Sequence, residues 1–379
     1  TYSYTNTTKH NPTISEDLMI HRHAQLGYAY PGKSKYILPF TKAFGTGKLS
    51  KSKWVKPVKD FNFNLVPTNL NFSTALDRQY GETYLRPITT DEIIEPTFNK
   101  YFTMDRNYGF KFDFTKSLNM DYNASNNARI DEPLGKIDTP EKKDTIWNNL
   151  KNLGRTTNFH HTTNLNYTLP FNKLPITDFM TGSFRYGSDY TWTASPMVLD
   201  TVNGHSFMTD NPWGNTISNT QNINFNADAN FHTLYAKVKW LKKYDTNNSN
   251  GLKNNLNNIK PKTGKDDAGN DSKDQTTNDT KTNDGKTTTN NTSKKTTTTI
   301  PPQGYFVRLL LSVKRVNFTY AETHNTILPG FNFKPGAFGQ SFAHGAPGFD
   351  FVLGMQPDSN WMNSKSSKGW FSTDTTLNY

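Results

Sequence analysis

The clearest pattern in the chain is an unbroken alternation of apolar and polar residues over positions 221–231. Ile223, Phe225 and Phe231 occupy one set of alternate positions, and asparagine and aspartate fill the other. Because successive side chains of a strand point to opposite faces, this segment predicts a strand with one apolar face and one amide-rich face. Strands of soluble sandwiches alternate in a similar way, so one such strand does not identify a membrane barrel.

The same alternation recurs along the chain and predicts an all-β fold of about ten strands, mostly near the 9–11 residues that a tilted membrane strand needs. The alternating segments are 22–30, 61–65, 70–76, 108–114, 118–124, 159–169, 184–192, 221–231 and 316–320. We expect connections 31–57, 170–177 and 233–314 at one end of the sheet. The loops 7–21, 81–103, 125–156 and 193–215 are expected at the other end.

In a transmembrane barrel, alternate side chains of each strand face lipid and a wet lumen. The predicted lipid-facing residues are Phe110, Phe112, Phe114, Ile223, Phe225 and Phe231. The predicted lumen-facing residues are Lys111, Asp113, Asn222, Asn224, Asn226, Asp228 and Asn230. We therefore expect a segment of an antiparallel transmembrane β-barrel.

One clear helix is predicted near 139–153. Thr139 is a suitable N-cap, and Pro140 and Glu141 favour the first turn. Apolar residues recur on one face from Ile146 to Leu153, and Gly154 is suited to end the helix. We expect this helix to lie in a loop, packed across the mouth or rim of the barrel.

The chain divides by composition into barrel strands over 1–244, a low-complexity insertion over 245–302, and a further strand with a long loop over 303–379. The insertion is dominated by Asn, Thr, Lys, Asp, Gly and Ser, which predicts disorder. The sequence has no run of about 18 apolar residues and opens at Thr1 in alternating sequence. We expect an internal fragment of a longer protein.

The composition favours strands with thin apolar faces and argues against a large aliphatic core. Only 33% of the residues are hydrophobic, yet 13% are aromatic, with 26 Phe and 18 Tyr. The chain has no cysteine, so neither disulfides nor thiol chemistry is available. The net charge is +11, but the basic residues form no stripe and accompany no nucleic-acid-binding motif, so a nucleic-acid partner is not expected.

Candidate chemistry is sparse. His21 and His23 would share a strand face, whereas His160 and His161 would not, and a histidine pair alone is weak support for a metal site. Asp131 and Glu132 are adjacent in a predicted turn, which is a poor geometry for a catalytic dyad. Residues 45–48 lack the spacing of a phosphate-binding loop. We expect no enzymatic activity, no cofactor and no metal.

Several short motifs carry a resemblance to a known family. They are ARIDEP (128–133), WNNLKNLGRTT (147–157), NYTLP (166–170), KDFNFN (59–64), NTISN (215–219), LPGF (328–331) and APG (346–348). Together they resemble the SprA/Sov family, the outer-membrane translocon of the type IX secretion system in Bacteroidota. The resemblance covers essentially the whole chain outside 245–299.

The resemblance implies a protein-conducting pore in the outer membrane of a Gram-negative cell, with this chain as a segment of its very large antiparallel transmembrane β-barrel. Its implied partners are folded cargo proteins with C-terminal sorting domains, a PorV-type shuttle barrel, a periplasmic plug protein and outer-membrane lipid. It also implies a role in gliding motility in gliding bacteria. Two alternatives stay open: another outer-membrane barrel, such as a nutrient receptor or porin, and a soluble β-sandwich adhesin or carbohydrate-binding module.

Overall fold

The computed structural model describes residues 1–40, 54–87, 94–202, 205–238, 307, 309 and 311–372. The chain forms two compact units, Thr1–Ala229 with Asn317–Tyr379, and Asn230–Val316. The larger unit holds nearly all the described structure. In the smaller unit, the described residues include the short helix α4 (Phe231–Lys237). The predicted insertion over 245–302 lies outside the described residues.

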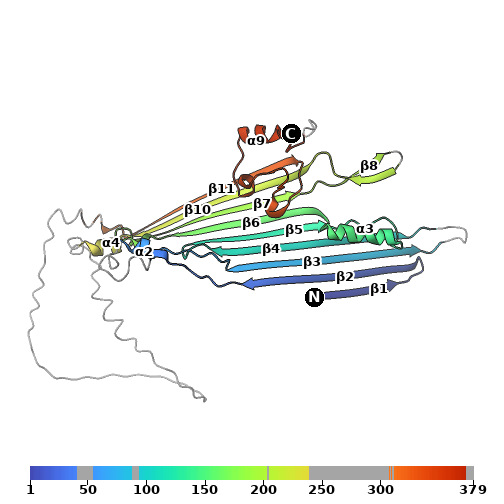
Figure 1. Cartoon of the computed structure of the whole chain (residues 1–379), viewed down its shortest axis with the longest axis horizontal. Helices are drawn as coiled ribbons and strands as arrows, with labels where there is room; N and C mark the ends of the chain where they lie inside the picture. The colour runs from blue at the N-terminus through green and yellow to red at the C-terminus, as the bar shows by residue number, and fades with distance from the viewer. Residues whose placement is uncertain are drawn as a thin grey trace, which may run out of the picture. The chain divides into compact units, whose positions relative to one another are not determined.

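The larger unit is built on one nine-stranded sheet with the order β1-β2-β3-β4-β5-β6-β7-β10-β11 (Figure 1). Its strands are β1 (Tyr2–Lys9), β2 (Ile14–Pro31), β3 (Asn69–Leu85), β4 (Thr97–Asp113), β5 (Leu118–Arg129), β6 (Arg155–Leu169), β7 (Met180–Thr193), β10 (Asn215–Asn230) and β11 (Arg315–Phe331). From β1 to β10 every neighbouring pair is antiparallel. The predicted antiparallel β fold is confirmed, and the described sheet is open.

We call the two ends of this sheet the turn end, at residues 114–117 and 170–179, and the helix end, at residues 130–154. As expected, the connections that follow β2, β6 and β10 all leave from the turn end. The turn end also carries the 3-10 helix η2 (Phe171–Lys173). At the helix end, the connection expected as a plain loop over 193–215 contains a separate hairpin, β8 (Val198–Val202) and β9 (His205–Thr209).

Several strands are longer than the alternation predicted. β2 has 18 residues, and β3 and β4 have 17 each. β3 runs to Leu85 and β4 begins at Thr97, so the expected loop over 81–103 was too long. Near the helix end both faces of these strands carry polar residues, such as Arg78 and Gln79, so the apolar–polar alternation disappears although the backbone pairing continues.

The alternating segment 61–65 was predicted to be a strand, and this prediction was wrong. Only the single bridge from Ile37 to Phe63 pairs it with another segment. The alternation has another cause: Asn62 and Asn64 are buried, at 5% and 2% exposure. Asn62 Oδ1 accepts a hydrogen bond from the Lys116 backbone N–H at 2.8 Å, which supports the turn between β4 and β5, and Asn64 Nδ2 donates to the carbonyl oxygen of Val66 at 2.7 Å. The short helix α2 (Lys56–Lys59) precedes this segment.

The predicted loop helix is confirmed as α3 (Pro140–Lys151). The Thr139 side chain caps it by accepting a hydrogen bond from the Lys142 backbone N–H. Leu153 and Gly154 both adopt positive φ, which ends the helix in the left-handed conformation that glycine favours. Ile146 and Leu150 of this helix line a cavity together with residues of β2, β3 and β4. The helix therefore lies against one face of the sheet at these strands.

Residues 332–372, here the C-terminal segment, cover part of the same face. They were expected to form a long loop, and they contain the 3-10 helix η3 (Ala337–Gly339) and the helices α8 (Phe349–Val352) and α9 (Ser359–Ser366). The principal core lies between this segment and the sheet. Its fully buried side chains include Phe159, Tyr190, Trp192, Ile217 and Phe351.

Among the described helices, none is long and apolar enough to cross a membrane.

Candidate functional site

The strand register sorts the side chains of the sheet onto two unlike faces. Directly paired residues of antiparallel strands lie on the same face. One row across the five strands β4, β5, β6, β7 and β10 reads Phe112, Met120, Leu165, Tyr186 and Ile223. We call the face that carries this row the aromatic face.

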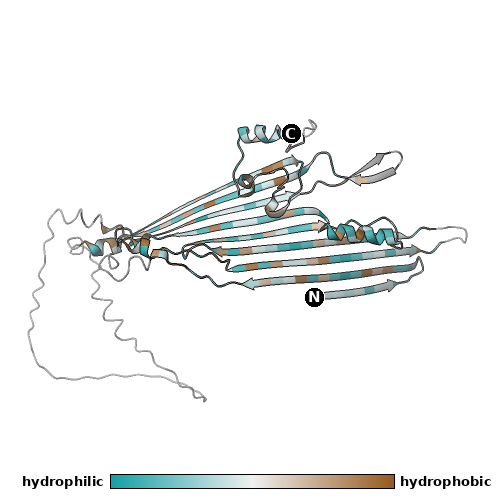
Figure 2. Ribbon diagram, viewed as in Figure 1, coloured by the Kyte–Doolittle hydropathy of each residue, from teal (hydrophilic) through white to brown (hydrophobic). Residues whose placement is uncertain are grey.

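The adjacent row, on the opposite face, has a different chemistry. It reads Lys111, Asp121, Asn164, Gly187 and then Asn222. We call this the asparagine-rich face. Figure 2 shows the corresponding alternation of hydrophilic and hydrophobic residues along the strands.

The residues predicted to face lipid or lumen fall on separate faces wherever they belong to the sheet. The aromatic face carries Phe110, Phe112, Ile223 and Phe225. The asparagine-rich face carries Lys111, Asp113, Asn222, Asn224, Asn226 and Asp228, and Asn230 is the last residue of β10. Phe114 follows the end of β4, and Phe231 begins helix α4, so strand alternation does not place these two side chains.

The asparagine-rich face is uniformly polar over β5, β6, β7 and β10, all of which are fully described. The four strands have 12 to 16 residues each, yet none of them places an aliphatic residue, Phe, Tyr or Trp on this face. On β6 and β10 the residues are Thr156, Asn158, His160, Thr162, Asn164, Asn166 and Thr168, and Thr216, Ser218, Thr220, Asn222, Asn224, Asn226, Asp228 and Asn230. Such a surface has nothing to bury against a second apolar layer.

Side chains on the asparagine-rich face contact one another across neighbouring strands. His160 Nε2 lies 2.7 Å from an oxygen of Asp189, and Lys111 Nζ lies 3.5 Å from an oxygen of Asp121. Amides also bond across strands, as in the 3.0 Å bond from Asn166 to Asn119. The face therefore combines dense hydrogen-bonding capacity with charges of both signs.

The predicted histidine pair lies on the same face. Asp77 on β3 accepts from both His21 and His23 on β2, at 3.0 and 3.2 Å. Among the described residues, no group of three or more His, Cys, Asp or Glu side chains has the arrangement of a metal site. The pair and Asp77 form a small polar cluster.

The aromatic face is apolar near the turn end, where we call its apolar residues the aromatic band. On the outer strands these side chains are open to the surroundings, with Leu26 66% and Phe318 54% exposed. The band consists of Ala24, Leu26, Tyr28, Tyr30, Leu70, Phe72, Leu76, Phe110, Phe112, Leu118, Met120, Leu165, Tyr167, Phe184, Tyr186, Ile223, Phe225, Phe318 and Tyr320.

The aromatic band crosses the strands obliquely. On β2 and β3 it begins at the paired residues Tyr30 and Leu70. The same row, followed across the sheet, reaches Ser188 and its partner Gln221, which are polar. On β7 and β10 the band lies nearer the turn end, up to Tyr186. An oblique band is what a flat apolar layer produces on strands that tilt by about 35–45°.

Between the band and the helix end, side chains of the aromatic face form hydrogen bonds to main-chain carbonyl oxygens of the C-terminal segment. Asn219 Nδ2 donates to the carbonyl oxygens of Phe351 and Met355, both at 2.8 Å. His161 Nε2 lies 3.1 Å from the carbonyl oxygen of Val352. Tyr186, Tyr190 and Trp192 donate in the same way to the carbonyls of Leu353, Gly339 and Phe333. These polar side chains interrupt the apolar alternation because they bind main chain.

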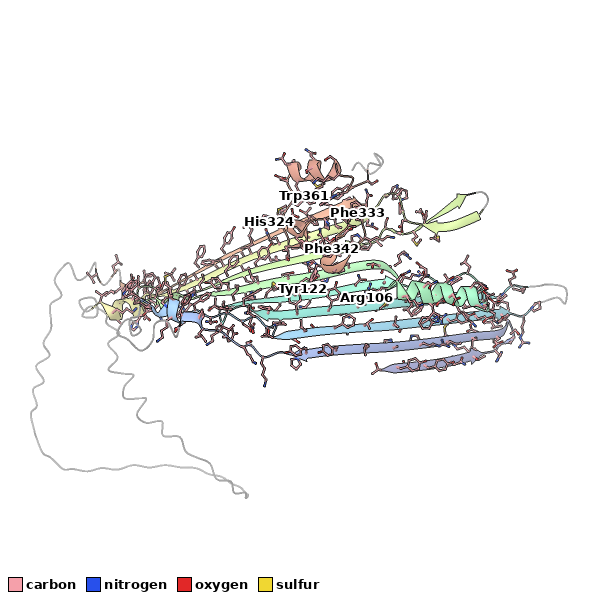
Figure 3. All side chains as sticks on the ribbon, in the orientation of Figure 1. Arg106, Tyr122, His324, Phe333, Phe342 and Trp361 are labelled. Carbon is pink, nitrogen blue, oxygen red and sulfur yellow. The ribbon has the colours of Figure 1, made fainter. Side chains whose placement is uncertain are left out.

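Aromatic contacts complete the attachment (Figure 3). Tyr122 on β5 meets the Phe338 ring edge-on at 5.4 Å, and its other neighbours include Phe110 at 5.0 Å. On the outer side, Phe351 stacks on Trp361 at 5.5 Å. The segment is thus joined to the sheet by both rings and hydrogen bonds.

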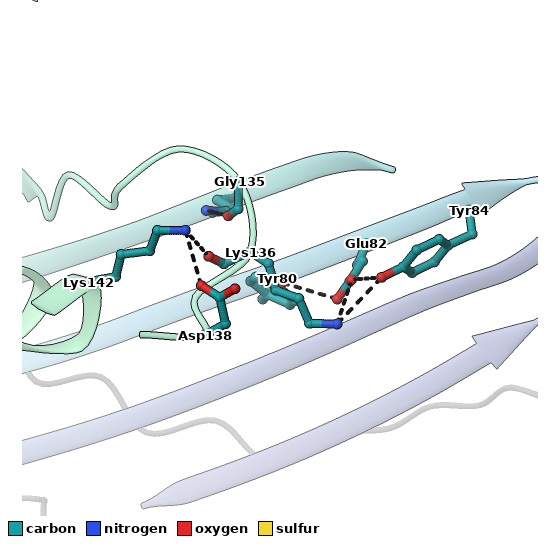
Figure 4. Close-up of polar contacts among 8 residues, drawn as sticks. Tyr80, Glu82, Tyr84, Gly135, Lys136, Asp138 and Lys142 are labelled. Atoms are coloured by element: carbon teal, nitrogen blue, oxygen red, sulfur yellow. Dashed lines mark hydrogen bonds and ion pairs between the residues drawn. The ribbon is translucent and has the colours of Figure 1, made fainter. Parts of the chain in front are cut away.

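A second polar cluster lies beside α3 at the helix end (Figure 4). Glu82, almost fully buried, accepts from Tyr80 at 3.1 Å and from Tyr84, and it pairs with Lys136 at 3.1 Å. The hydrogen bonds to Glu82 and Tyr84 raise the pKa of Lys136. Lys142 bonds the Lys136 carbonyl oxygen at 2.7 Å, so this cluster fixes the loop before α3 to β3.

The adjacent carboxylates Asp131 and Glu132, judged a poor catalytic dyad from the sequence, bind different partners. Asp131 faces Arg155, with Nε to Oδ2 at 3.0 Å, whereas Glu132 turns to Arg78, with Nε to Oε1 at 2.5 Å. Sequence analysis also missed the role of His161 and Asn219 as backbone clamps. The signal that could have revealed them is a polar residue at the apolar parity of a strand.

The sequence matches no protein-family model, and no curated protein matches it.

Proposed function

We propose that this chain is part of a transmembrane β-barrel in the outer membrane, with the aromatic band in contact with lipid and the asparagine-rich face toward a water-filled lumen. The observation that carries the proposal is the uniform polarity of one face over β5, β6, β7 and β10, opposite a band of exposed aromatic and aliphatic side chains. A lumen needs the first surface and hydrocarbon needs the second. The oblique course of the band supports tilted strands.

Within that class, the proposed function is conduction of folded proteins by the SprA/Sov-type translocon of the type IX secretion system. The support is the set of sequence motifs together with the chemistry of the asparagine-rich face. Amides and hydroxyls, with charges paired as in Lys111–Asp121, avoid the strong single-sign field that would retain charged cargo. The proposed partners are sorting-domain cargo, a PorV-type shuttle barrel and a periplasmic plug protein.

Cysteine scanning of β10 in the full-length protein tests the lumen assignment. Single cysteines at positions 222–228, placed in cells and probed with a membrane-impermeant thiol reagent, should label at even positions and be protected at odd positions. Labelling of both parities would contradict a lipid-facing band. Bulky reagents attached at the even positions should also reduce secretion. Labelling at these positions with unchanged secretion would contradict the passage of cargo through the lumen.

A soluble β-sandwich is the second candidate, because the C-terminal segment and α3 already cover part of the aromatic face. In that case the exposed band would pack against a second apolar layer. Residues Leu26, Tyr28 and Phe72 would then be buried in the full-length protein. Protection of cysteines at these three positions in detergent-free soluble extract would favour this alternative.

A further inference from the structure

A large cavity lies between helix α3 and the aromatic face of β2, β3 and β4. Its volume is about 860 Å³, within the range of small-molecule sites. The cavity lies toward the helix end of the sheet. Its strand residues other than His23 lie on the aromatic face, and none of them belongs to the core under the C-terminal segment.

Apolar side chains contribute to both the floor and the roof of this cavity. Ile20, Leu76 and Phe102 contribute from the strands, and Ile146 and Leu150 contribute from α3. Leu76 and its strand partner Ala24, which also lines the cavity, are the last members of the aromatic band on their strands. The hydrocarbon surface of the band therefore reaches the cavity, where the paired residues Arg22 and Arg78 form the next row.

Basic side chains gather along the same cavity. Arg22, Arg78, Lys136 and Lys143 line it, against the single carboxylate of Glu82. Two of the four are neutralised, because Lys136 pairs with Glu82 at 3.1 Å and Arg78 bonds the buried Glu132, which lies outside the lining.

The other two cations carry the excess positive charge. Arg22 lies over the Tyr4 ring at 5.7 Å, and a guanidinium placed on a ring keeps its N–H donors free at the edge. Within the described contacts, neither Arg22 nor Lys143 has a carboxylate partner. An apolar cavity with two such cations is complementary to a molecule that has a hydrocarbon chain and an anionic head.

We propose that the cavity binds one membrane lipid with an anionic phosphate headgroup. An acyl chain lies between Leu76 and Ile146, and Arg22 and Lys143 bind the phosphate. Basic pockets at a membrane surface bind acidic lipid headgroups by the same combination of charge and chain burial. The inference goes beyond the proposed function, since it concerns neither cargo nor the lumen.

Trp147 lines the cavity and gives a local readout. The full-length protein is reconstituted in phosphatidylcholine mixed with lipid brominated on the acyl chain, and the Trp147 contribution is obtained by subtracting a Trp147→Phe variant. Brominated phosphatidylglycerol should quench this contribution more strongly than brominated phosphatidylcholine at equal mole fraction. One cation–headgroup contact corresponds to an affinity ratio of about fivefold.

The double variant Arg22→Gln/Lys143→Gln should remove the preference for phosphatidylglycerol. Lys151→Gln, on the same helix but outside the cavity lining, should retain it. Equal quenching by the two lipids, or no quenching of Trp147, would overturn the proposal. Complete competition by inorganic phosphate would also overturn it, because the acyl chain would then contribute nothing.

Repeating the measurement in mixed micelles separates this proposal from membrane insertion. A protein that fails to enter bilayers but still prefers brominated phosphatidylglycerol in micelles would contradict the barrel and support the lipid site. A protein that inserts into bilayers but shows no preference for brominated phosphatidylglycerol would support the barrel and contradict the lipid site.

Discussion

His160 and His161 are neighbours in the chain that serve opposite faces of the sheet. His160 bonds Asp189 on the asparagine-rich face, whereas His161 is fully buried on the aromatic face with Nε2 3.1 Å from the carbonyl oxygen of Val352. The strand parity thus decides whether the same side chain is a solvated polar group or part of the core.

This pair gives the first prediction. His161→Ala should destabilise the attachment of the C-terminal segment by about 2–3 kcal/mol, since it removes a buried ring and leaves a carbonyl without its donor. The measurement is the rate of limited proteolysis within residues 340–358 of the full-length protein. His160→Ala, at a partly exposed contact with Asp189, should change that rate little. Equal effects of the two variants would contradict the clamp.

Gly339 gives a second test of the same attachment. It has φ of +73°, and a Cβ there would lie 2.5 Å from the Tyr190 ring. Gly339→Ala should therefore cost about 2 kcal/mol or more through strain and overlap. Gly345→Ala is the matched control, with φ of +60° and nothing within 4 Å of the added Cβ. Gly345→Ala should lose less stability, and the difference between the two variants in thermal unfolding measures the cost of the overlap with Tyr190.

The barrel assignment makes the third prediction. Phe225→Arg on the aromatic band should cost roughly 2–4 kcal/mol near the bilayer midplane and lower the amount of folded protein in the outer membrane. Asn226→Arg, on the next residue and the other face, should leave that amount unchanged. Heat-modifiable mobility of the membrane fraction measures both. An equal loss for the two variants would show that parity does not govern insertion.

The exposed aromatic band makes the fourth prediction. Residues 1–379, expressed alone, should associate in plain buffer and become monodisperse in detergent, because Leu26, Tyr28, Phe72 and Phe318 form an exposed apolar surface beside open strand edges. Size-exclusion chromatography with light scattering measures the outcome. A monodisperse monomer in buffer, with a cooperative unfolding transition, would favour the soluble alternative.

Sequence alternation was sufficient to predict the strands whose two faces differ. Phe225 and Asn226 could be assigned to opposite faces of a strand, because adjacent side chains of a strand always point to opposite faces. Helix α3 was predicted for an equally local reason, since the Thr139 cap and Gly154 mark its ends.

Predictions failed where distant residues decide the structure. Asn62 and Asn64 alternate with aromatic residues but bind loop backbone, so a strand-like pattern gave an irregular segment. Likewise, Asn219 looks misplaced at an apolar position until the carbonyls of Phe351 and Met355 are present, more than 130 residues later. Such contacts leave no periodic trace in the local sequence.

The clamp on the C-terminal segment has an evolutionary consequence. Tyr186 and Asn219 bind the main-chain carbonyls of Leu353 and Met355, while the side chains of those two residues are exposed. A carbonyl is the same in every amino acid, so substitutions at positions 353 and 355 leave the docking bonds intact. The segment is thus free to diversify at its outer surface, whereas the donors on the strands are constrained to remain.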